Sequence, residues 1–326
     1  MRHRLKGTEL SISRIGLGTS NFGKRTGPAA SRAIMAAAVD HGVNLIDTAD
    51  MYGSAALAEE VIAPFLVGRR DRVVLATKFG FNRTGDEIQS GRGARSLINL
   101  SIEASLRRLR TDHIDLYQMH YPDPGTPIDE TLETLTALQR QGKIRHFGCA
   151  NFAPAELREA NERATALGTP HFRSVQTELS LLSRSAERDL LPICASLDIT
   201  VVAYFVLARG LLTGKYVRGA AVPATWRLSG RRGQVLLTDA NFDVVEALTA
   251  FASERGVPIA ALAIGSALAM PAVGSALVGA TSVRQLEELV AASTWTPARS
   301  DLDALDGLMN SAPHAATALN PITPQP

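Results

Sequence analysis

The chain has 326 residues, of which 45% are hydrophobic and 20% are charged, and 34 basic against 32 acidic side chains give a formal net charge of +2. This composition indicates a globular protein, and its near-neutral charge argues against a nucleic-acid partner. Two cysteines are too few for a disulfide scaffold, and no apolar run has the length of a membrane span. We therefore expect a cytoplasmic protein that binds a small molecule and does not contact a membrane.

The first residues predict a small β-hairpin. Residues 5–10 and 11–15 surround a turn at Gly7-Thr8. We expect this hairpin to cover the bottom of the structure that follows.

From Ile15 onward, short apolar segments alternate with longer segments of helical period, which is typical of βα units around a parallel sheet. Eight such units predict an α/β fold of the closed (β/α)8 TIM-barrel type. No internal repeat or linker divides them, so we expect residues 1–326 to form one domain with a flexible tail at about 311–326. The expected strands are Ile15–Gly18, Val43–Ile46, Val73–Thr77, Ile114–Met119, Ile144–Gly148, Ser174–Gln176, Thr200–Tyr204 and Ala276–Val278.

One helix between these strands ends in a cluster of cations. Apolar residues recur on one face from Ile98 to Leu109, and the last turn contains Arg107, Arg108 and Arg110. Because cations are favourable at the carboxyl end of a helix, we expect a solvated helix end here rather than a polyanion site.

Three longer stretches do not follow the alternation: residues 79–93, residues 208–238 and the tail. Loops that follow strands lie at the carboxyl-terminal mouth of such a barrel, where substrates bind. The first two stretches are therefore candidates for the walls of a binding cavity.

Titratable residues stand at the ends of three consecutive strands. Asp47, Lys78 and His120 close the second, third and fourth strands, and Tyr52 follows Asp47 by five residues. Each has an ordinary structural role when taken singly, such as capping a helix or packing a ring. Three neighbouring strands that deliver such groups to one rim are better explained by a catalytic site.

These four residue types suit the reduction of a carbonyl. A carbonyl that receives hydride develops negative charge on oxygen, and a tyrosine donates the proton once its pKa falls from ~10. The Lys78 ammonium would lower the pKa of Tyr52, and Asp47 would hold Lys78 in place. His120 would orient the carbonyl and share the developing charge.

Several segments resemble the signatures of the aldo-keto reductase superfamily over nearly the whole chain. They are Asp47-Thr-Ala-x-x-Tyr52-Gly53, the strand-end Lys78, Asp115-x-x-x-x-His120, and Gly142-Lys-Ile-Arg-x-Phe-Gly148 followed by Asn151. The resemblance implies an NAD(P)H-dependent enzyme that acts on CH-OH and C=O groups. It also implies that Asp47, Tyr52, Lys78 and His120 form a catalytic tetrad.

The same resemblance implies a cofactor lying across the barrel mouth. Asn151 and Gln176 would bind the nicotinamide carboxamide, and Tyr204 would stack on the ring. Ser282 begins a capping box that suits the 2′-phosphate of NADPH, so NADPH is favoured and NADH is the alternative. Phe205-Val206 stands where relatives usually have Ser-Pro. The other implied cofactor residues are Gly18, Leu207, Arg209, Gly210, Lys215, Gly279, Gln285 and Glu288.

The substrate side of the site is inferred from position along the chain. Phe22, Met51, Phe79 and Tyr121 are candidates for the cavity wall. The expected substrate is a small-molecule aldehyde or ketone, with a sugar or keto-sugar as one candidate. A further candidate is a phosphorylated or nucleotide-linked keto-sugar from a biosynthetic pathway, because Arg227, Arg231 and Arg232 lie in the second long loop. The sequence does not indicate an oligomer.

Two other functions compete with reduction. A regulatory subunit with the reductase fold would sense the cofactor without turnover. A metal-dependent hydrolase would use Asp47, Asp115 and His120, but Asp115 begins the strand that His120 ends, so we expect no metal site.

Overall fold

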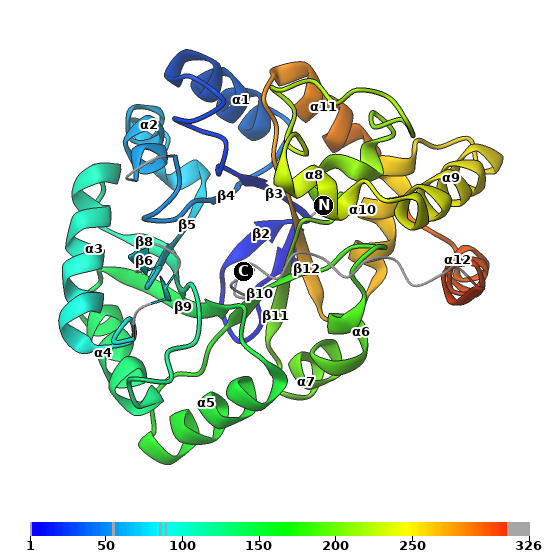
Figure 1. The fold of residues 1–326 in the computed structure, drawn as a ribbon. Coiled ribbons are helices and arrows are strands. Elements are labelled where there is room, and N and C mark those ends of the chain that lie inside the picture. Colours follow the sequence, from blue (N-terminus) through cyan, green and yellow to red (C-terminus); the bar gives the residue numbers. More distant parts are fainter. Residues whose placement is uncertain (1, 54–55, 82, 85–86, 89, 312–326) are drawn as a thin grey trace.

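The computed structural model describes residues 2–53, 56–81, 83–84, 87–88 and 90–311. Within them, eight parallel strands form a closed barrel in the order β10-β11-β12-β3-β4-β5-β8-β9, and Figure 1 shows the helices arranged around its outside. The predicted (β/α)8 barrel is confirmed. The barrel strands are β3 (Ile15–Gly18), β4 (Leu45–Asp47), β5 (Val74–Phe79), β8 (Ile114–Met119), β9 (Ile144–Ala150), β10 (Ser174–Glu178), β11 (Thr200–Tyr204) and β12 (Val273–Val278).

The helices occupy the segments between the strands. No single helix among the described residues has the length and apolar composition of a membrane span. The helices α9 (Asp239–Glu254) and α10 (Ile259–Ala269) meet that test only when they are taken together, and they meet at an angle of 90°. The helices are α1 (Pro28–Asp40), α2 (Leu57–Leu66), α3 (Arg95–Leu109), α4 (Ile128–Arg140), α5 (Pro154–Leu167), α6 (Ser185–Asp189), α7 (Leu191–Ser196), α8 (Arg231–Leu236), α9 (Asp239–Glu254), α10 (Ile259–Ala269), α11 (Val283–Ala292) and α12 (Arg299–Ser311), with the 3-10 helices η1 (Arg70–Arg72) and η2 (Ala208–Thr213).

The two long loops contain some structure of their own. The loop at 79–93 includes the antiparallel pair β6 (Arg83–Thr84) and β7 (Glu87–Ile88), and the loop at 208–238 includes η2 and α8. The last strand begins at Val273, three residues before its predicted start. The prediction started too late because Gly274 and Ser275 interrupt the apolar pattern of the strand. The predicted tail lies outside the described residues from residue 312 onward.

Side chains alternate between the inside of the barrel and the layer beneath the helices. In β5, Val74 and Ala76 belong to the inner hydrophobic cluster. Leu75 and Phe79 belong to the cluster between strands and helices. The alternation therefore directs Lys78 into the barrel.

The amino-terminal hairpin is present, but its strands are not where the sequence predicts them. They are β1 (Arg2–Arg4) and β2 (Ser11–Ser13), and residues 5–10 form the connection between them. Leu5 and Ile12 are fully buried in the inner cluster together with Leu45, so the hairpin closes this end of the barrel with apolar side chains.

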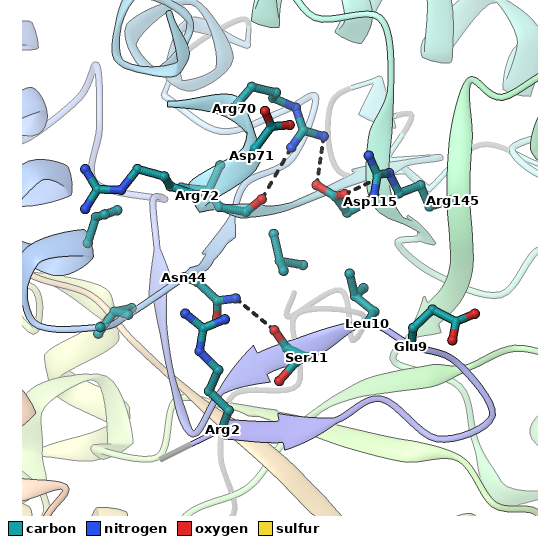
Figure 2. Close-up of a pocket in the computed structure, with 15 residues that line it drawn as sticks. Arg2, Glu9, Leu10, Ser11, Asn44, Arg70, Asp71, Arg72, Asp115 and Arg145 are labelled. Carbon is teal, nitrogen blue, oxygen red and sulfur yellow. Dashed lines mark hydrogen bonds and ion pairs between the residues drawn. The ribbon is translucent and has the colours of Figure 1, made fainter. Parts of the chain in front are cut away.

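A cavity of about 430 Å³ lies beside this hairpin, at the starts of the strands (Figure 2). Asp115 is its most buried acid, and its carboxylate pairs with Arg70 at 2.7 Å and with Arg145 at 3.3 Å. Asn44 Nδ2 donates a hydrogen bond to the carbonyl of Ser11 at 2.8 Å, which fastens the hairpin. Asp115 therefore neutralises cations at the amino-terminal end of β8, whereas His120 follows the carboxyl-terminal end of that strand.

Candidate active site

Asp47 and Lys78 form a buried ion pair at the ends of the neighbouring strands β4 and β5. Lys78 Nζ lies 2.7 and 2.9 Å from the two carboxylate oxygens of Asp47 and also donates to the carbonyl of Thr48 at 2.9 Å. Gln176 Nε2, from β10, donates to the same carboxylate at 2.9 Å. The polar groups of the pair are therefore well satisfied, as a buried ion pair requires.

Tyr52 stands above this pair on the loop between β4 and α2. Its hydroxyl lies 3.5 Å from Lys78 Nζ. The next residue is Gly53, with φ of +75°, where a Cβ atom would approach the carbonyl oxygen of Phe22 to 2.3 Å. Only glycine fits this turn, and the turn fixes where the Tyr52 ring is held.

His120 completes the group from the end of β8. Its ring meets that of Tyr52 edge-on at 6.1 Å and stacks on Tyr121 at 5.0 Å. Burial lowers the pKa of His120 well below its usual value, and the charges of Lys78 and Arg92 lower it further. The imidazole is therefore neutral at physiological pH and offers one N–H donor.

The pKa of Tyr52 moves in the direction opposite to the one predicted from the sequence. Burial raises it, and the carboxylate of Asp47 raises it further. The physical reasons are that burial disfavours a charged phenolate and that Asp47, 2.7 Å from Lys78, offsets part of the positive charge that would stabilise it. The phenol is protonated throughout the physiological range.

A cavity of about 780 Å³ opens at the carboxyl-terminal end of the barrel and includes this group. It extends past η2 to the residues just before and within the first turn of α11. Its volume is in the range of cofactor sites. The predicted site residues that line it are Gly18, Asp47, Met51, Tyr52, His120, Tyr121, Asn151, Gln176, Tyr204, Leu207, Arg209, Gly210, Lys215, Gly279 and Gln285.

Two predicted wall residues belong to the core instead. Phe22 and Phe79 are fully buried and do not line the cavity. Phe79 stacks on Tyr117 at 4.8 Å, because strand alternation turns it away from the side of Lys78. Phe81, which the sequence analysis did not single out, lines the cavity and lies 5.3 Å from the His120 ring. Alternation separates Phe79 from Lys78, whereas Phe81 lies beyond the end of β5, after Gly80 with φ of +83°, where the alternation no longer applies.

The residues around Asn151 fit the amide end of a nicotinamide dinucleotide. Asn151 has φ of +62° and donates from Nδ2 to the carbonyl of His120 at 2.9 Å. Its Oδ1 accepts a hydrogen bond from the Tyr204 hydroxyl at 2.7 Å. Since each amide nitrogen carries two protons, Asn151 and Gln176 each keep one donor beyond those bonds for a carboxamide.

Of the three predicted cofactor residues in and before α11, which are Ser282, Gln285 and Glu288, Gln285 lines the cavity. Ser282 Oγ accepts a hydrogen bond from the Gln285 N–H at 3.2 Å, as predicted for the helix cap. Ser282 and Glu288 do not line the cavity. Glu288 pairs with Arg284 at 2.8 Å on the exposed face of the helix, because the two are one turn apart.

A buried ion pair behind β5 is absent from the sequence prediction. Arg108 does not end in solvent; its Nε donates to the fully buried carboxylate of Glu59, in α2, at 2.7 Å. Thr77 Oγ1 donates to the other oxygen of Glu59 at 2.6 Å. The signal in the sequence was a pair of acids, Glu59 and Glu60, within the apolar run of α2. Among the described residues, no group of three or more His, Cys, Asp or Glu side chains is arranged to hold a metal ion.

Comparisons with known proteins agree with this geometry. The family model of the aldo/keto reductase family matches residues 14–310. The oxidoreductase YrpG of Bacillus subtilis is 35% identical, covering 87% of this chain and 88% of the relative. The aldo-keto reductase YhdN of the same organism is 33% identical, covering 98% and 95%. A solved structure of a glycerol dehydrogenase from Gluconobacter oxydans superposes with a TM-score of 0.83 at 31% identity, covering 99% and 98% of the two chains.

Proposed function

Since the chain belongs to the aldo/keto reductase family, we propose that it reduces an aldehyde or ketone to an alcohol with NADPH, using Tyr52 as the proton donor. Family membership makes it an NAD(P)H-dependent oxidoreductase that acts on carbonyl groups. The observation that carries the role of Tyr52 is the placement of its hydroxyl 3.5 Å from Lys78, at the rim of the large cavity.

The residues of the site have distinct tasks in this proposal. Tyr52 holds its proton until a carbonyl oxygen begins to gain charge, and then donates it from the hydroxyl to that oxygen, which becomes the stronger base. His120, which is neutral, donates a hydrogen bond to the same oxygen. Lys78 stabilises the phenolate that remains after proton transfer. The bound nicotinamide supplies the hydride to the carbonyl carbon.

The cavity residues suggest how a dinucleotide would be held. Asn151 and Gln176 would bind the carboxamide, and the ring of Tyr204 would cover one face of the nicotinamide. Arg209 and Lys215 would bind the diphosphate by charge. We favour NADPH because the amino-terminal end of α11, near Gln285, is a favourable place for a further phosphate.

We propose a small polyhydroxylated carbonyl compound, such as a sugar, as the substrate. The Gluconobacter oxydans relative is a glycerol dehydrogenase, which supports a small polar substrate. Met51, Phe81 and Tyr121 would pack against its carbon chain. A cytoplasmic location agrees with the two buried cysteines, Cys149 and Cys194, which are free thiols.

Tyr52→Phe tests the proposal. We expect its turnover of a panel of aldehydes and sugars to fall by about 10²- to 10⁴-fold, the usual contribution of general acid catalysis. NADPH should still quench its intrinsic fluorescence with a wild-type dissociation constant. Tyr121→Phe, in the same cavity, is the matched control and should remain active. Wild-type turnover in Tyr52→Phe would overturn the mechanism, and cofactor binding without turnover of any carbonyl by the wild type would favour a sensing role.

A further inference from the structure

Arg92 is a buried cation beside the end of β5. Only 5% of its surface is exposed. A Cβ atom placed on Gly80 would lie 3.3 Å from the Cβ atom of Arg92, so the two residues are in contact. The residue before Gly80 is Phe79, whose carbonyl accepts a hydrogen bond from the backbone N–H of His120 at 2.8 Å. Arg92 therefore packs against the short segment to which His120 is bonded.

The backbone around Arg92 is fixed by Asp123. The carboxylate of Asp123 accepts hydrogen bonds from the backbone N–H groups of Gly91 at 3.2 Å and of Gly93 at 2.9 Å. Asp123 follows His120 by three residues. One segment after β8 therefore carries the imidazole and also holds both chain neighbours of Arg92 in place.

Each of the two side chains has one buried nitrogen atom without a hydrogen-bond partner among the described residues. These atoms are Nε of Arg92 and Nδ1 of His120. Nε of an arginine only donates hydrogen bonds, whereas one ring nitrogen of a neutral imidazole accepts them. Burial and the charge of Lys78 lower the pKa of His120, and the charge of Arg92 lowers it further, so the ring is neutral. The two atoms are thus complementary, but they are not bonded to each other.

Water is the partner that both atoms can share. Buried polar groups in proteins are nearly always hydrogen-bonded, either to other protein groups or to internal water. One water molecule accepts a hydrogen bond from a donor and donates another to an acceptor, so it would satisfy both nitrogen atoms. His120 lines the large cavity, and Nδ1 is the buried nitrogen of its ring, so Nε2 is the nitrogen that can meet a substrate.

We propose that Arg92 is a positioning residue for His120, and that its Nε–H group binds a water molecule that donates a hydrogen bond to Nδ1 of His120. This bond makes Nδ1 the acceptor, so the single proton of the neutral ring stays on Nε2. The Nε2–H group then donates to the carbonyl oxygen of the substrate. With the proton on Nδ1, the lone pair of Nε2 would repel that oxygen as its negative charge develops. The inference rests on the proposed reductase function and adds a residue that acts on it through His120.

Two substitutions of similar length separate the N–H group of Arg92 from its charge. Arg92→Gln removes the charge but places an amide nitrogen where the arginine has Nε. Arg92→Met also removes the charge and places a methyl group there. We expect kcat for carbonyl reduction to fall by about 10- to 100-fold in Arg92→Met, comparable to the loss of a group that orients a metal-binding histidine. Arg92→Gln should recover most of this loss.

Nitrogen NMR of the histidine rings gives a readout that does not need turnover. The protein is produced with isotope-labelled histidine, and the signals of His120 are assigned by their loss in His120→Gln. We expect the ring proton on Nε2 in the wild type and in Arg92→Gln, and a mixture of the two tautomers in Arg92→Met. Arg95→Met is the matched control and should resemble the wild type in both readouts, because Arg95 is exposed at the start of α3 and pairs with Glu133 at 3.4 Å.

The outcomes separate this inference from its alternatives. Equal losses of kcat in Arg92→Met and Arg92→Gln would assign the effect to the charge of Arg92 and overturn the inference. Identical His120 spectra for the wild type and Arg92→Met would also overturn it, and so would wild-type turnover in Arg92→Met. If the wild type reduces no carbonyl, the reductase proposal fails, and the His120 spectra still decide whether Arg92 sets the tautomer.

Discussion

Arg108 and Glu59 are joined at 2.7 Å in the layer between the barrel and its helices. The carboxylate of Glu59 is fully buried, and the side chain of Arg108 keeps 22% of its exposure. The pair links α3 to α2, and Thr77 links it to β5, the strand that carries Lys78 on its opposite face. A partly buried residue of α3 is thereby connected to the strand that carries Lys78 of the proposed catalytic group.

Arg108→Ala should destabilise the protein strongly. Removing one partner leaves an uncompensated buried carboxylate, which costs about 3–5 kcal/mol. We expect a clear fall in the melting temperature measured by circular dichroism. Arg107→Ala is the control, because Arg107 is exposed on the same turn of α3 and should change the melting temperature little. Equal melting temperatures for the two variants would show that the ion pair does not contribute.

The stability of the protein should depend on Asp50 between pH 4 and 7. Burial raises the pKa of this carboxyl to about 7, and the charge of Glu59 adds to the rise. The folded state therefore binds a proton that the unfolded chain releases, so stability is lost as pH rises through this window, by up to ~4 kcal/mol. Asp50→Asn mimics the protonated acid and should melt higher than the wild type at pH 8 but not at pH 4.

Glu178 adds a similar dependence that Asp50→Asn does not remove. Its pKa is also raised to about 7 by burial. The loss of stability with rising pH that Glu178 causes should therefore be removed in the double variant with Glu178→Gln. The same change in melting temperature from pH 4 to pH 8 in the wild type and the double variant would contradict both assignments.

Reduction and oxidation should respond differently to pH. In the proposed mechanism reduction uses the protonated phenol of Tyr52, and the raised pKa keeps that form populated well into the alkaline range. We expect kcat for carbonyl reduction to stay constant from about pH 6 to about pH 9, while alcohol oxidation, which needs the phenolate, increases with pH across the alkaline range. Steady-state kinetics in both directions with one substrate pair provide the measurement. A decline of reduction near neutral pH would show that another group donates the proton.

The proposed catalytic group was predictable from the sequence because its members follow a local rule. Asp47, Lys78 and His120 each stand at the end of an apolar segment, and a closed barrel brings those ends to one rim. Contacts between distant segments were not predictable in this way. The period of α3 shows that Arg108 flanks the apolar face, but nothing local to it indicates that Glu59 is its partner. The contact of Arg227 with Phe205, where the guanidinium carbon lies 5.0 Å from the ring centre, depends likewise on how the long loop at 208–238 folds over the mouth.

The two phenylalanines at the end of β5 give a direct test of which side chains the substrate meets. Phe79→Ala should destabilise the protein by about 3–5 kcal/mol, because it empties a fully buried position stacked on Tyr117. Its KM for substrates that the wild type accepts should change little. Phe81→Ala should do the reverse, with a nearly unchanged melting temperature and a higher KM, because Phe81 lines the cavity beside His120 and Tyr121.

Melting temperatures and steady-state kinetics of both variants distinguish the two positions, and Phe81→Leu, which keeps much of the apolar volume, should recover part of the KM. The predicted contrast follows from position: Phe79 is the last residue of β5 and lies on the face opposite Lys78, whereas Phe81 follows Gly80, whose φ of +83° ends the alternation. A raised KM in Phe79→Ala at unchanged stability would mean that the Phe79 side chain faces the cavity. Lys78, the preceding residue of β5, would then face the helices instead of Asp47.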